Sequence, residues 1–441
     1  MSDSPILIIG AGISGLVLAQ YLQRQDIPFR IFDRDSAINA RSGGWGLTLH
    51  WSLPALRELL PEHIVERLPE TFVNKEASGR GDTGRFQFFD LKSGDALYSI
   101  PAAERIRVSR VRLRELLTTG VDVQWDRNFR DIESIADQIT AHFEDGTSYT
   151  GRLLVACDGS RSRTREILYP GVQMNQLPVQ LLGASTLYSA EELGGIELID
   201  PFIFQGSHPE SNVFLFFSCE SVKSSFIFCG LLIALVLDTP NNFENSSKDR
   251  YHCQIITSWA DSKQIPVPDA NAERIALIKK VTDGWSEPFR SLIHKLPDDV
   301  EVRSIRIEDW MFSLGRAHAH PRAVLMGDSA HTMTMFRGEG ANNAIVDVLD
   351  LVTRIDMCQP RYKSSHFGLS LIRLKLIHAL SITRSFDSEA LKSSLAAYEN
   401  AVFARAEPSF LNSRQACLDA HDFSRIEGSP LVGLRDFKKS G

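Results

Sequence analysis

The first 33 residues pass from apolar to polar and back in the order of a strand–helix–strand unit. Ile6–Ile9 is wholly apolar, as in a parallel strand covered on both faces. Residues 16–22 repeat apolar side chains at helical spacing. Phe29–Phe32 is a second short strand and ends at Asp33. Because such a unit needs about 30 residues, the pattern predicts a parallel sheet covered by helices.

Similar patterns continue along the chain. The segments predicted to be helical are 52–70, 110–118, 340–355 and 388–406. Residues 78–100 and 121–155 are strand-like, with a hairpin signal at 144–146. Between 175 and 310, apolar and aromatic segments predict a mixed sheet; they are 179–182, 202–204, 213–217, 226–237 and 253–259. A further buried strand is predicted at 323–326.

One of these segments, 226–237, raises the question of a membrane span. It has 12 residues, whereas a spanning helix needs about 20. A buried strand or core helix is therefore the expected structure. The chain start carries Asp3 and an apolar stretch interrupted by glycines, unlike a secretory signal. We expect a cytoplasmic protein with reduced thiols and no transmembrane anchor.

Composition narrows the class of protein without pointing to a substrate. The 441 residues are 43% hydrophobic with a formal net charge of −7, which are ordinary globular proportions. The mild acidity argues against a nucleic-acid binder, which would show a basic excess. The six cysteines form no C-x-x-C pair, so zinc-finger and redox motifs lack support. The length suggests two to four domain-sized units.

A G-x-G-x-x-G motif follows the first strand at Gly10, Gly12 and Gly15. The first glycine permits a tight turn, the second lets a pyrophosphate approach the backbone, and the third lets helix and strand pack closely. Asp33 ends the next strand, where it can accept hydrogen bonds from a ribose. The alternative is a glycine-rich turn without a ligand. This motif alone does not decide between NAD and FAD.

Two more motifs follow predicted buried strands. One begins at Asp158, in Asp-Gly-Ser-Arg-Ser-Arg, and the other at Gly327, in Gly-Asp-Ser-Ala-His. Each places a carboxylate just beyond a strand end, where α/β sheets bind ligands. The later segment 337–342 is glycine-rich and leads into a helix, so its amides can cradle a phosphate or an electron-rich ring edge. Each motif alone is a weak signal.

Together, in this order and spacing, the three motifs resemble those of the class A FAD-dependent monooxygenases, whose type member is para-hydroxybenzoate hydroxylase. The resemblance covers about residues 5–350. In detail, the sequence is similar to a fungal branch of this family that oxidises secondary metabolites. It implies an α/β fold: a Rossmann-like FAD-binding domain, an inserted mixed β-sheet substrate domain and C-terminal helices. The implied boundaries are 1–170 with 311–356 for FAD, 171–310 for the substrate, and 384–441 for the C-terminal helical segment.

The resemblance also implies roles for individual residues. Asp33 binds the adenosine ribose, Gly46 contacts FAD through its backbone, and Arg110 reaches the phosphates or adenosine. Asp158 belongs to a motif linked to FAD and NADPH, and Asp328 binds the ribityl or pyrophosphate region. The flavin-facing loop supplies Gly338, Gly340, Ala341 and Asn342. Arg110 is equally compatible with an exposed cation at a helix start. No catalytic residue and no metal ligand is predicted.

The implied reaction uses bound FAD, NADPH or NADH as a transient co-substrate, and O₂. Through a flavin hydroperoxide, an oxygen atom passes to an aromatic or polycyclic substrate such as a polyketide, meroterpenoid or indole alkaloid. The alternatives are Baeyer-Villiger-type oxygen insertion, a FAD oxidase, an inactive FAD-fold binding protein, and an NAD-dependent dehydrogenase. Ring position, the choice of NADPH or NADH, and oligomeric state are not predicted.

Several features depart from the family or admit a plainer explanation. Thr332 and Met335 stand where the family often has prolines. Residues 220–236 and 357–383 are out of register with the family; they are either genuine insertions or retained introns in a gene model. His331 is interpreted as a packing or capping residue. His318 and His320 have metal-like spacing but no third ligand, so a polar turn is the expectation.

Overall fold

The computed structural model describes residues 4–40, 46–100, 104–222, 250–315, 319–357 and 388–433. These residues divide into two units, each assembled from three stretches of chain. The first unit comprises the described parts of Met1–Thr71, Arg110–Asn175 and Glu308–Arg414. The second comprises those of Phe72–Ser109, Gln176–Ile307 and Gln415–Gly441. The predicted segment 226–237 and most of 220–236 and 357–383 lie outside the described residues.

The first unit is built on a five-stranded sheet with the order β19-β11-β1-β2-β7. The bounds are β1 Ile6–Ile9, β2 Phe29–Phe32, β7 Val123–Gln124, β11 Leu153–Ala156 and β19 Ala323–Leu325. Every neighbouring pair is parallel. β1 and β11 are buried at every position, which is why their sequences are apolar without alternation.

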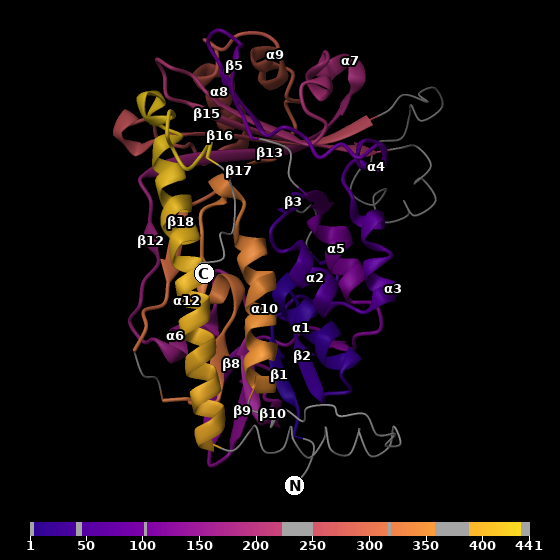
Figure 1. Cartoon of the computed structure of the whole chain (residues 1–441). Coiled ribbons are helices and arrows are strands. Elements are labelled where there is room, and N and C mark those ends of the chain that lie inside the picture. Colours follow the sequence, from indigo (N-terminus) through magenta and orange to yellow (C-terminus); the bar gives the residue numbers. More distant parts are fainter. Residues whose placement is uncertain are drawn as a thin grey trace. The chain divides into compact units, whose positions relative to one another are not determined.

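Shorter strands and several helices complete the first unit (Figure 1). The strands are β3 Gly46–Leu49, β8 Phe129–Ile135, β9 Gln138–Phe143, β10 Ser148–Gly151, β18 Glu308–Met311 and β20 His331–Thr332. The helices are α1 Ile13–Arg24, α2 Leu53–Leu59, α3 Glu62–Val65, α5 Arg110–Leu117, α6 Arg163–Leu168 and α10 Gly340–Met357. Short 3-10 turns are η1 Leu68–Thr71, η5 Gly327–Ser329 and η6 Met335–Arg337.

Two predicted helices differ from the observed ones in extent. The segment 52–70 is divided into α2, α3 and η1, because Pro61 lacks the N–H needed to continue α2 and instead caps α3. The helix predicted at 388–406 is longer: α12 spans Ser388–Asp419 and contains Pro408. The hairpin predicted at 144–146 joins β9 to β10, and Gly146 adopts the left-handed conformation there.

The second unit contains a seven-stranded mixed sheet with the order β17-β13-β16-β15-β14-β4-β5. The strands are β4 Gln87–Asp90, β5 Ala96–Ser99, β13 Val179–Ser189, β14 Ile203–Ser207, β15 Phe214–Val222, β16 Arg250–Ala260 and β17 Val302–Ser304. Only β14 and β4 pair in parallel among the pairs described. This mixed pairing confirms the predicted fold class.

The remaining elements of the second unit are short. They are α4 Lys75–Gly79, β6 Ile106–Ser109, α7 Ala190–Leu193, η2 Ile196–Leu198, η4 Asp261–Lys263, α8 Asn271–Val281, α9 Phe289–His294 and η7 Phe423–Arg425. The two-residue strand β12, Asn175–Gln176, spans the division between the units.

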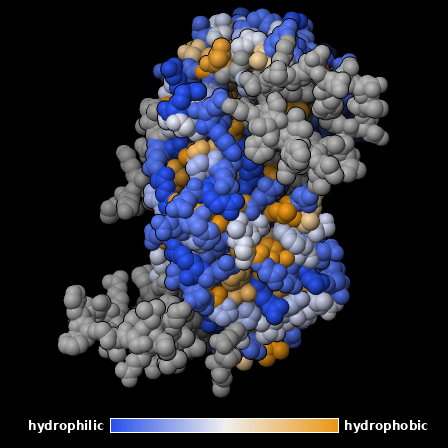
Figure 2. Space-filling model, turned by 90° about the vertical axis from the view of Figure 1, so that its right-hand side faces the viewer, coloured by the Kyte–Doolittle hydropathy of each residue, from blue (hydrophilic) through white to orange (hydrophobic). Residues whose placement is uncertain are grey.

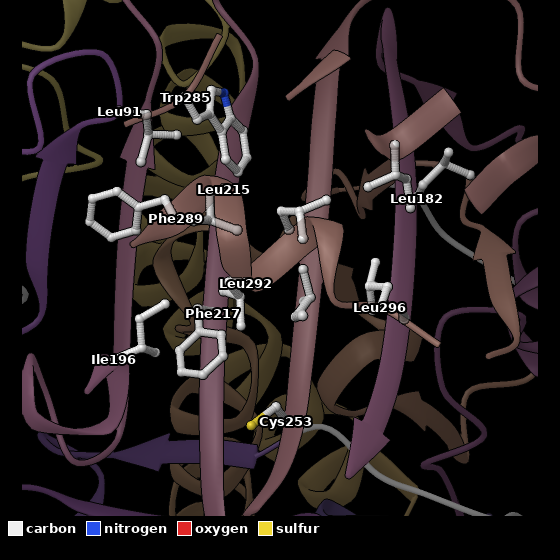
Figure 3. Packing of buried hydrophobic residues seen from close by; sticks show 14 of the residues in the cluster. Leu91, Leu182, Ile196, Leu215, Phe217, Cys253, Trp285, Phe289, Leu292 and Leu296 are labelled. Carbon is white, nitrogen blue, oxygen red and sulfur yellow. The ribbon is translucent and has the colours of Figure 1, made fainter. Parts of the chain in front are cut away.

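The α8–α9 segment covers one face of the seven-stranded sheet. The apolar side chains between the segment and the sheet form the core of this unit (Figure 3). Leu215 and Phe217 of β15 point toward Trp285, Phe289 and other apolar residues of that segment. Because side chains alternate along a strand, the intervening residues of β15 point to the opposite face of the sheet.

The units differ from the predicted domain boundaries at two places. β4 and β5, within the range predicted for the FAD domain, belong to the second unit because β4 pairs with β14. The chain after Arg414 also belongs to the second unit, where Ser207 Oγ donates to the Ala420 carbonyl at 2.8 Å. Which unit binds cofactor and which binds substrate remains a prediction.

The described helices were compared with the length and hydropathy that a membrane span needs. None of the described helices is both long and apolar enough to cross a bilayer. On the face shown in Figure 2, hydrophobic residues form small groups among hydrophilic ones.

Candidate functional site

A cavity of about 370 Å³ lies in the first unit at the carboxyl ends of its parallel strands. Ligands bind at this edge in open α/β sheets. Residues of all three sequence motifs line it, among them Gly10, Gly12, Asp33, Arg110, Asp158 and Asp328. The other predicted residues do not line this cavity; they are Gly15, Gly46, Gly338, Gly340, Ala341 and Asn342.

The three glycines of the first motif serve different purposes. A Cβ on Gly10, which has φ +105°, would lie 2.3 Å from the Cys157 carbonyl oxygen. A Cβ on Gly15 would lie 2.1 Å from the Gly10 carbonyl oxygen. At Gly12 the nearest atom to a Cβ would be 3.9 Å away. Gly10 and Gly15 are therefore required by packing, whereas Gly12 leaves space toward the cavity.

Gly12 also caps the start of α1, and no side chain caps the free amides there. The first turn of α1 carries no acidic residue. Unpaired N–H groups at the positive end of a twelve-residue helix form a site that favours an anion such as a phosphate. The geometry of the first motif thus fits a dinucleotide.

The Asp33 carboxylate is fixed in place by its neighbours. Its Oδ2 accepts the Ala11 N–H at 2.7 Å and its Oδ1 accepts the Asp35 N–H at 2.9 Å. Arg114 lies 3.4 Å from Asp33 Oδ2 and 3.2 Å from Asp35 Oδ2. A carboxylate offers about four acceptor positions, so Asp33 retains capacity for a ligand hydroxyl while its orientation is set.

Arg114 is a buried residue that the sequence prediction missed. Besides the two aspartates, it donates to the Ala11 carbonyl at 2.8 Å. The signal was present in the sequence, because Arg114 follows Arg110 by four residues, about one helical turn, in the predicted helix 110–118, from which only Arg110 was selected. Arg110 lines the cavity, as does Asp328.

Asp158 lines the cavity but uses its carboxylate internally. It accepts the Ser162 hydroxyl at 2.6 Å and the Thr164 N–H at 3.0 Å, which fixes the start of α6. Burial raises the pKa of Asp158, and these hydrogen bonds oppose that rise. The side chain therefore shapes the loop of the second motif, and the loop backbone is left to face the cavity.

Asp328 follows the third buried strand as predicted. Gly327 before it has φ +67°, and a Cβ there would lie 3.1 Å from Ser14 Oγ and 3.2 Å from Ala344 Cβ. Burial raises the pKa of the Asp328 carboxyl, and the nearby charges of His331 and Arg110 lower it in part.

The glycine-rich segment of the third motif is held by Asn342. The Asn342 Oδ1 accepts the His50 N–H at 3.0 Å and the Ser52 hydroxyl at 2.8 Å, and its Nδ2 donates to the Thr48 carbonyl at 2.9 Å. The side chain is completely buried. Asn342 thus joins the first turn of α10 to the segment that follows Gly46, and its predicted contact with FAD would come from the backbone.

Two histidines singled out from the sequence, His320 and His331, have protein partners. His320 Nδ1 lies 2.9 Å from Ser134 Oγ, and burial lowers its pKa; His318 lies outside the described residues. In the part of the chain that the structure describes, no three His, Cys, Asp or Glu side chains are grouped as a metal site. His331 Nε2 lies 2.7 Å from Asp347 Oδ2, which supports a structural role.

Comparison with known proteins gives concordant results. Residues 3–194 match a family described as the FAD binding domain. The chain is 38% identical to a probable FAD-dependent monooxygenase of Arthroderma benhamiae, over 98% of this chain and 95% of the relative. It is also 38% identical to the FAD-dependent monooxygenase dbaB of Emericella nidulans, over 80% of this chain and 86% of the relative.

A solved structure shares the fold. The 2,6-dihydroxypyridine-3-hydroxylase of Arthrobacter nicotinovorans aligns with a TM-score of 0.68, covering 100% of this chain and 99% of that one, at 15% sequence identity. At this identity the likeness shows the fold alone.

Proposed function

The chain belongs to the fungal FAD-dependent monooxygenases, as its motifs predicted, and from that membership we propose that it hydroxylates or epoxidises an aromatic or polycyclic secondary metabolite. In this proposal NADPH or NADH supplies two electrons and O₂ supplies the inserted atom. The substrate is a polyketide, a meroterpenoid or an indole alkaloid. The observation that carries the proposal is the convergence of three distant motifs on one cavity in the first unit.

The residues present fit the adenosine diphosphate part of FAD. Gly12 leaves open space next to the free amides of α1, and Arg110 supplies a positive charge at the same cavity. When bound, FAD supplies the electron-transfer and oxygen-activation chemistry, which no amino-acid side chain provides.

The protein's own residues would bind FAD and orient it. The amides at the start of α1 would bind the pyrophosphate. Asp33 would accept a ribose hydroxyl, because Ala11 and Arg114 already hold its carboxylate in one orientation. Asp158 and Asn342 would act through the loops they fix, since their side chains are engaged internally.

The seven-stranded sheet of the second unit is the proposed source of substrate contacts. On the face opposite its apolar core, Ser218 of β15 is paired with Gln254 of β16. The Arg107 guanidinium donates to Ser218 Oγ at 2.8 Å, and burial lowers the pKa of Arg107 to about 10. These polar groups among apolar strands suit a ring system that carries hydroxyl or carbonyl groups.

The proposal is tested with the purified full-length protein. A yellow preparation that retains FAD, with O₂ uptake driven by NADPH or NADH and stimulated by a phenol or an indole, is the expected result. The product should be heavier than the substrate by one oxygen atom. A metabolite that accumulates when the gene is deleted from its native host identifies the substrate to be supplied.

Different results point to the alternatives. Oxygen uptake without NAD(P)H, in which each substrate molecule loses two hydrogen atoms and one hydrogen peroxide is formed, would indicate a FAD oxidase. Insertion of oxygen between two carbon atoms would indicate Baeyer-Villiger-type chemistry. FAD binding without any NAD(P)H oxidation would indicate an inactive binding protein, and a folded, colourless protein that binds NADH tightly would contradict the flavin assignment.

A further inference from the structure

A buried group of ionisable side chains lies behind the Gly327–Ser329 turn of the first unit. Asp347 is its centre: Oδ2 accepts the Gly327 N–H at 2.7 Å and lies 2.7 Å from His331 Nε2. Oδ1 accepts a hydrogen bond from the Arg405 guanidinium. Asp347 and His331 are completely buried, and the Arg405 side chain is 5% exposed.

The acidic and basic side chains of this group form ion pairs with one another. Arg405 also lies 3.1 Å from Asp350 Oδ2 and donates to Asn343 Oδ1 at 2.7 Å. Burial alone raises the pKa of Asp347, but the charges of His331 and Arg405 outweigh it and hold the pKa at about 2. Asp347 is therefore ionised, and removing one partner would leave a buried charge uncompensated.

Asp347 contacts residues on both sides of Asp328 in the chain, and Asp328 lines the cavity. Gly327 precedes Asp328 and His331 follows it by three positions, and Asp347 binds both. Directly after His331, the Thr332 hydroxyl donates to the Asp328 carbonyl at 2.6 Å. Asp328 lines the cavity, whereas Asp347, His331 and Arg405 are absent from its lining. The turn that carries Asp328 is thus held at both ends from the side away from the cavity.

We propose that Asp347, together with His331 and Arg405, is a positioning element that fixes Asp328 toward the cavity and thereby sets the affinity of the first unit for FAD. The inference rests on the proposed FAD site and extends it to side chains that do not touch the cavity. A purely structural role for the same residues predicts lower stability with an unchanged affinity. The two roles are separated by measuring both quantities.

The experiment measures the FAD dissociation constant of apoprotein by quenching of flavin fluorescence. Asp347→Asn keeps the shape of the side chain but removes its charge and one of its two oxygens, so the contacts with Gly327, His331 and Arg405 cannot all be kept. We expect the dissociation constant to rise about tenfold or more, because small displacements of a binding group cost this much. His331→Gln should weaken FAD binding in the same direction, and the double variant should bind about as weakly as the single ones.

Tyr398→Phe is the matched control. The Tyr398 hydroxyl donates to the Leu325 carbonyl at 2.8 Å, so Tyr398 joins α12, the helix that carries Arg405, to β19 through a buried hydrogen bond. This variant should lose stability in urea and keep the wild-type dissociation constant. If Asp347→Asn behaves in the same way, the positioning role is wrong. His331→Gln decides the question if Asp347→Asn does not fold.

The outcome for the wild-type protein is read separately. Apoprotein that does not bind FAD would remove the proposed function and this inference together. Wild-type binding with unchanged affinity in both Asp347→Asn and His331→Gln would remove only the positioning role. A second readout, the midpoint potential of the bound flavin, should shift in Asp347→Asn and stay constant in Tyr398→Phe.

Discussion

At the scale of single residues, Gly10 and Gly12 look equivalent in the motif but meet different surroundings. A Cβ on Gly10, which has a positive φ, would clash with the backbone at Cys157, whereas a Cβ on Gly12, which has φ −79°, would lie at an ordinary contact distance of 3.9 Å from the Cys157 carbonyl oxygen. Packing constrains the first glycine, and the ligand would constrain the second. The two roles can therefore be separated by the same substitution.

Gly12→Ala should fold normally and lose affinity for FAD, because its Cβ would occupy the space proposed for the pyrophosphate. Gly10→Ala should fold poorly, because its Cβ would lie 2.3 Å from a carbonyl oxygen. Urea unfolding and FAD titration measure the two effects. Equal affinity of wild type and Gly12→Ala for FAD would place the dinucleotide elsewhere.

Sequence and structure agree unevenly at this scale. The positions of Asp33, Asp158 and Asp328 at strand ends followed from local patterns, and all three line the cavity. Local patterns did not predict the hydrogen bonds of Asp158 at the start of α6 or the ion pair between Arg114 and Asp33. Arg114 is 81 residues from Asp33, and periodicity within a short window carries no information about such a contact.

At the scale of elements, a bidentate ion pair between Arg414 and Asp309 joins α12 to β18. Arg414 Nε lies 2.6 Å from Asp309 Oδ2, and Arg414 donates through Nη2 to Asp309 Oδ1 at 2.7 Å. Asp309 is 1% exposed and Arg414 is 35% exposed at the side chain. The planar guanidinium matches the carboxylate in a way that an ammonium does not.

Arg414→Leu should lower the free energy of unfolding by about 2 kcal/mol, less than for a fully buried pair because Arg414 is partly solvated. Arg414→Lys should recover part of this loss. Urea titration of the three proteins at one pH gives the values. A loss identical for Leu and Lys would show that charge makes no contribution.

The turn that follows α12, in the second unit, contains a histidine that should respond to pH. His421 Nε2 lies 2.8 Å from Ser258 Oγ and its Nδ1 lies 2.7 Å from the Cys417 carbonyl. Burial lowers its pKa from 6.5 to about 4; the hydrogen bond to Cys417 raises it and the charge of Lys263 lowers it further.

Because the folded protein binds this proton more weakly than the unfolded chain, His421 favours folding above pH 6.5. That stability is lost as the pH falls from 6.5 to 4, and the loss amounts to roughly 3 kcal/mol. His421→Gln should flatten the profile of unfolding free energy over this range. The exposed His63 supplies a control: His63→Gln should retain the wild-type slope.

Element boundaries were predictable where local sequence dominates. β1, β2 and α1 followed from apolar spacing and glycines. The segment 52–70 is divided at Pro61. The sequence analysis predicted one helix there because it followed the spacing of the apolar residues and gave no weight to this proline. The extension of α12 past 406 has contributions from contacts such as that of Arg414 with Asp309, which lies 105 residues away in the chain.

At the scale of the whole molecule, each unit is assembled from three separated stretches. The resemblance to a family predicted a FAD domain of two stretches around one inserted substrate domain, whereas composition and length gave only a range of domain numbers. The placement of β4 and β5 in the second unit depends on a parallel pairing with β14, more than 100 residues later. Such pairings follow from tertiary packing and are invisible to a local pattern.

FAD should stabilise the first unit in proportion to its affinity. At 100 times the dissociation constant, binding adds about 2.7 kcal/mol, which should raise the melting temperature by about 5–10 °C. Calorimetry of apoprotein with and without FAD measures the shift. Gly12→Ala should show no shift, and a shift of wild-type size in that variant would disagree with the proposed role of α1.

The strand order of the first sheet also has a consequence for synthesis. β11 is complete at Ala156, but its neighbour β19 begins only at Ala323. At about 5–20 residues per second, the ribosome needs about 10–30 s to supply that partner. During this interval a nascent chain would carry an apolar edge strand without its neighbour, a known template for aggregation. Efficient production of this protein should therefore depend on chaperones that bind the nascent chain before residue 323 emerges.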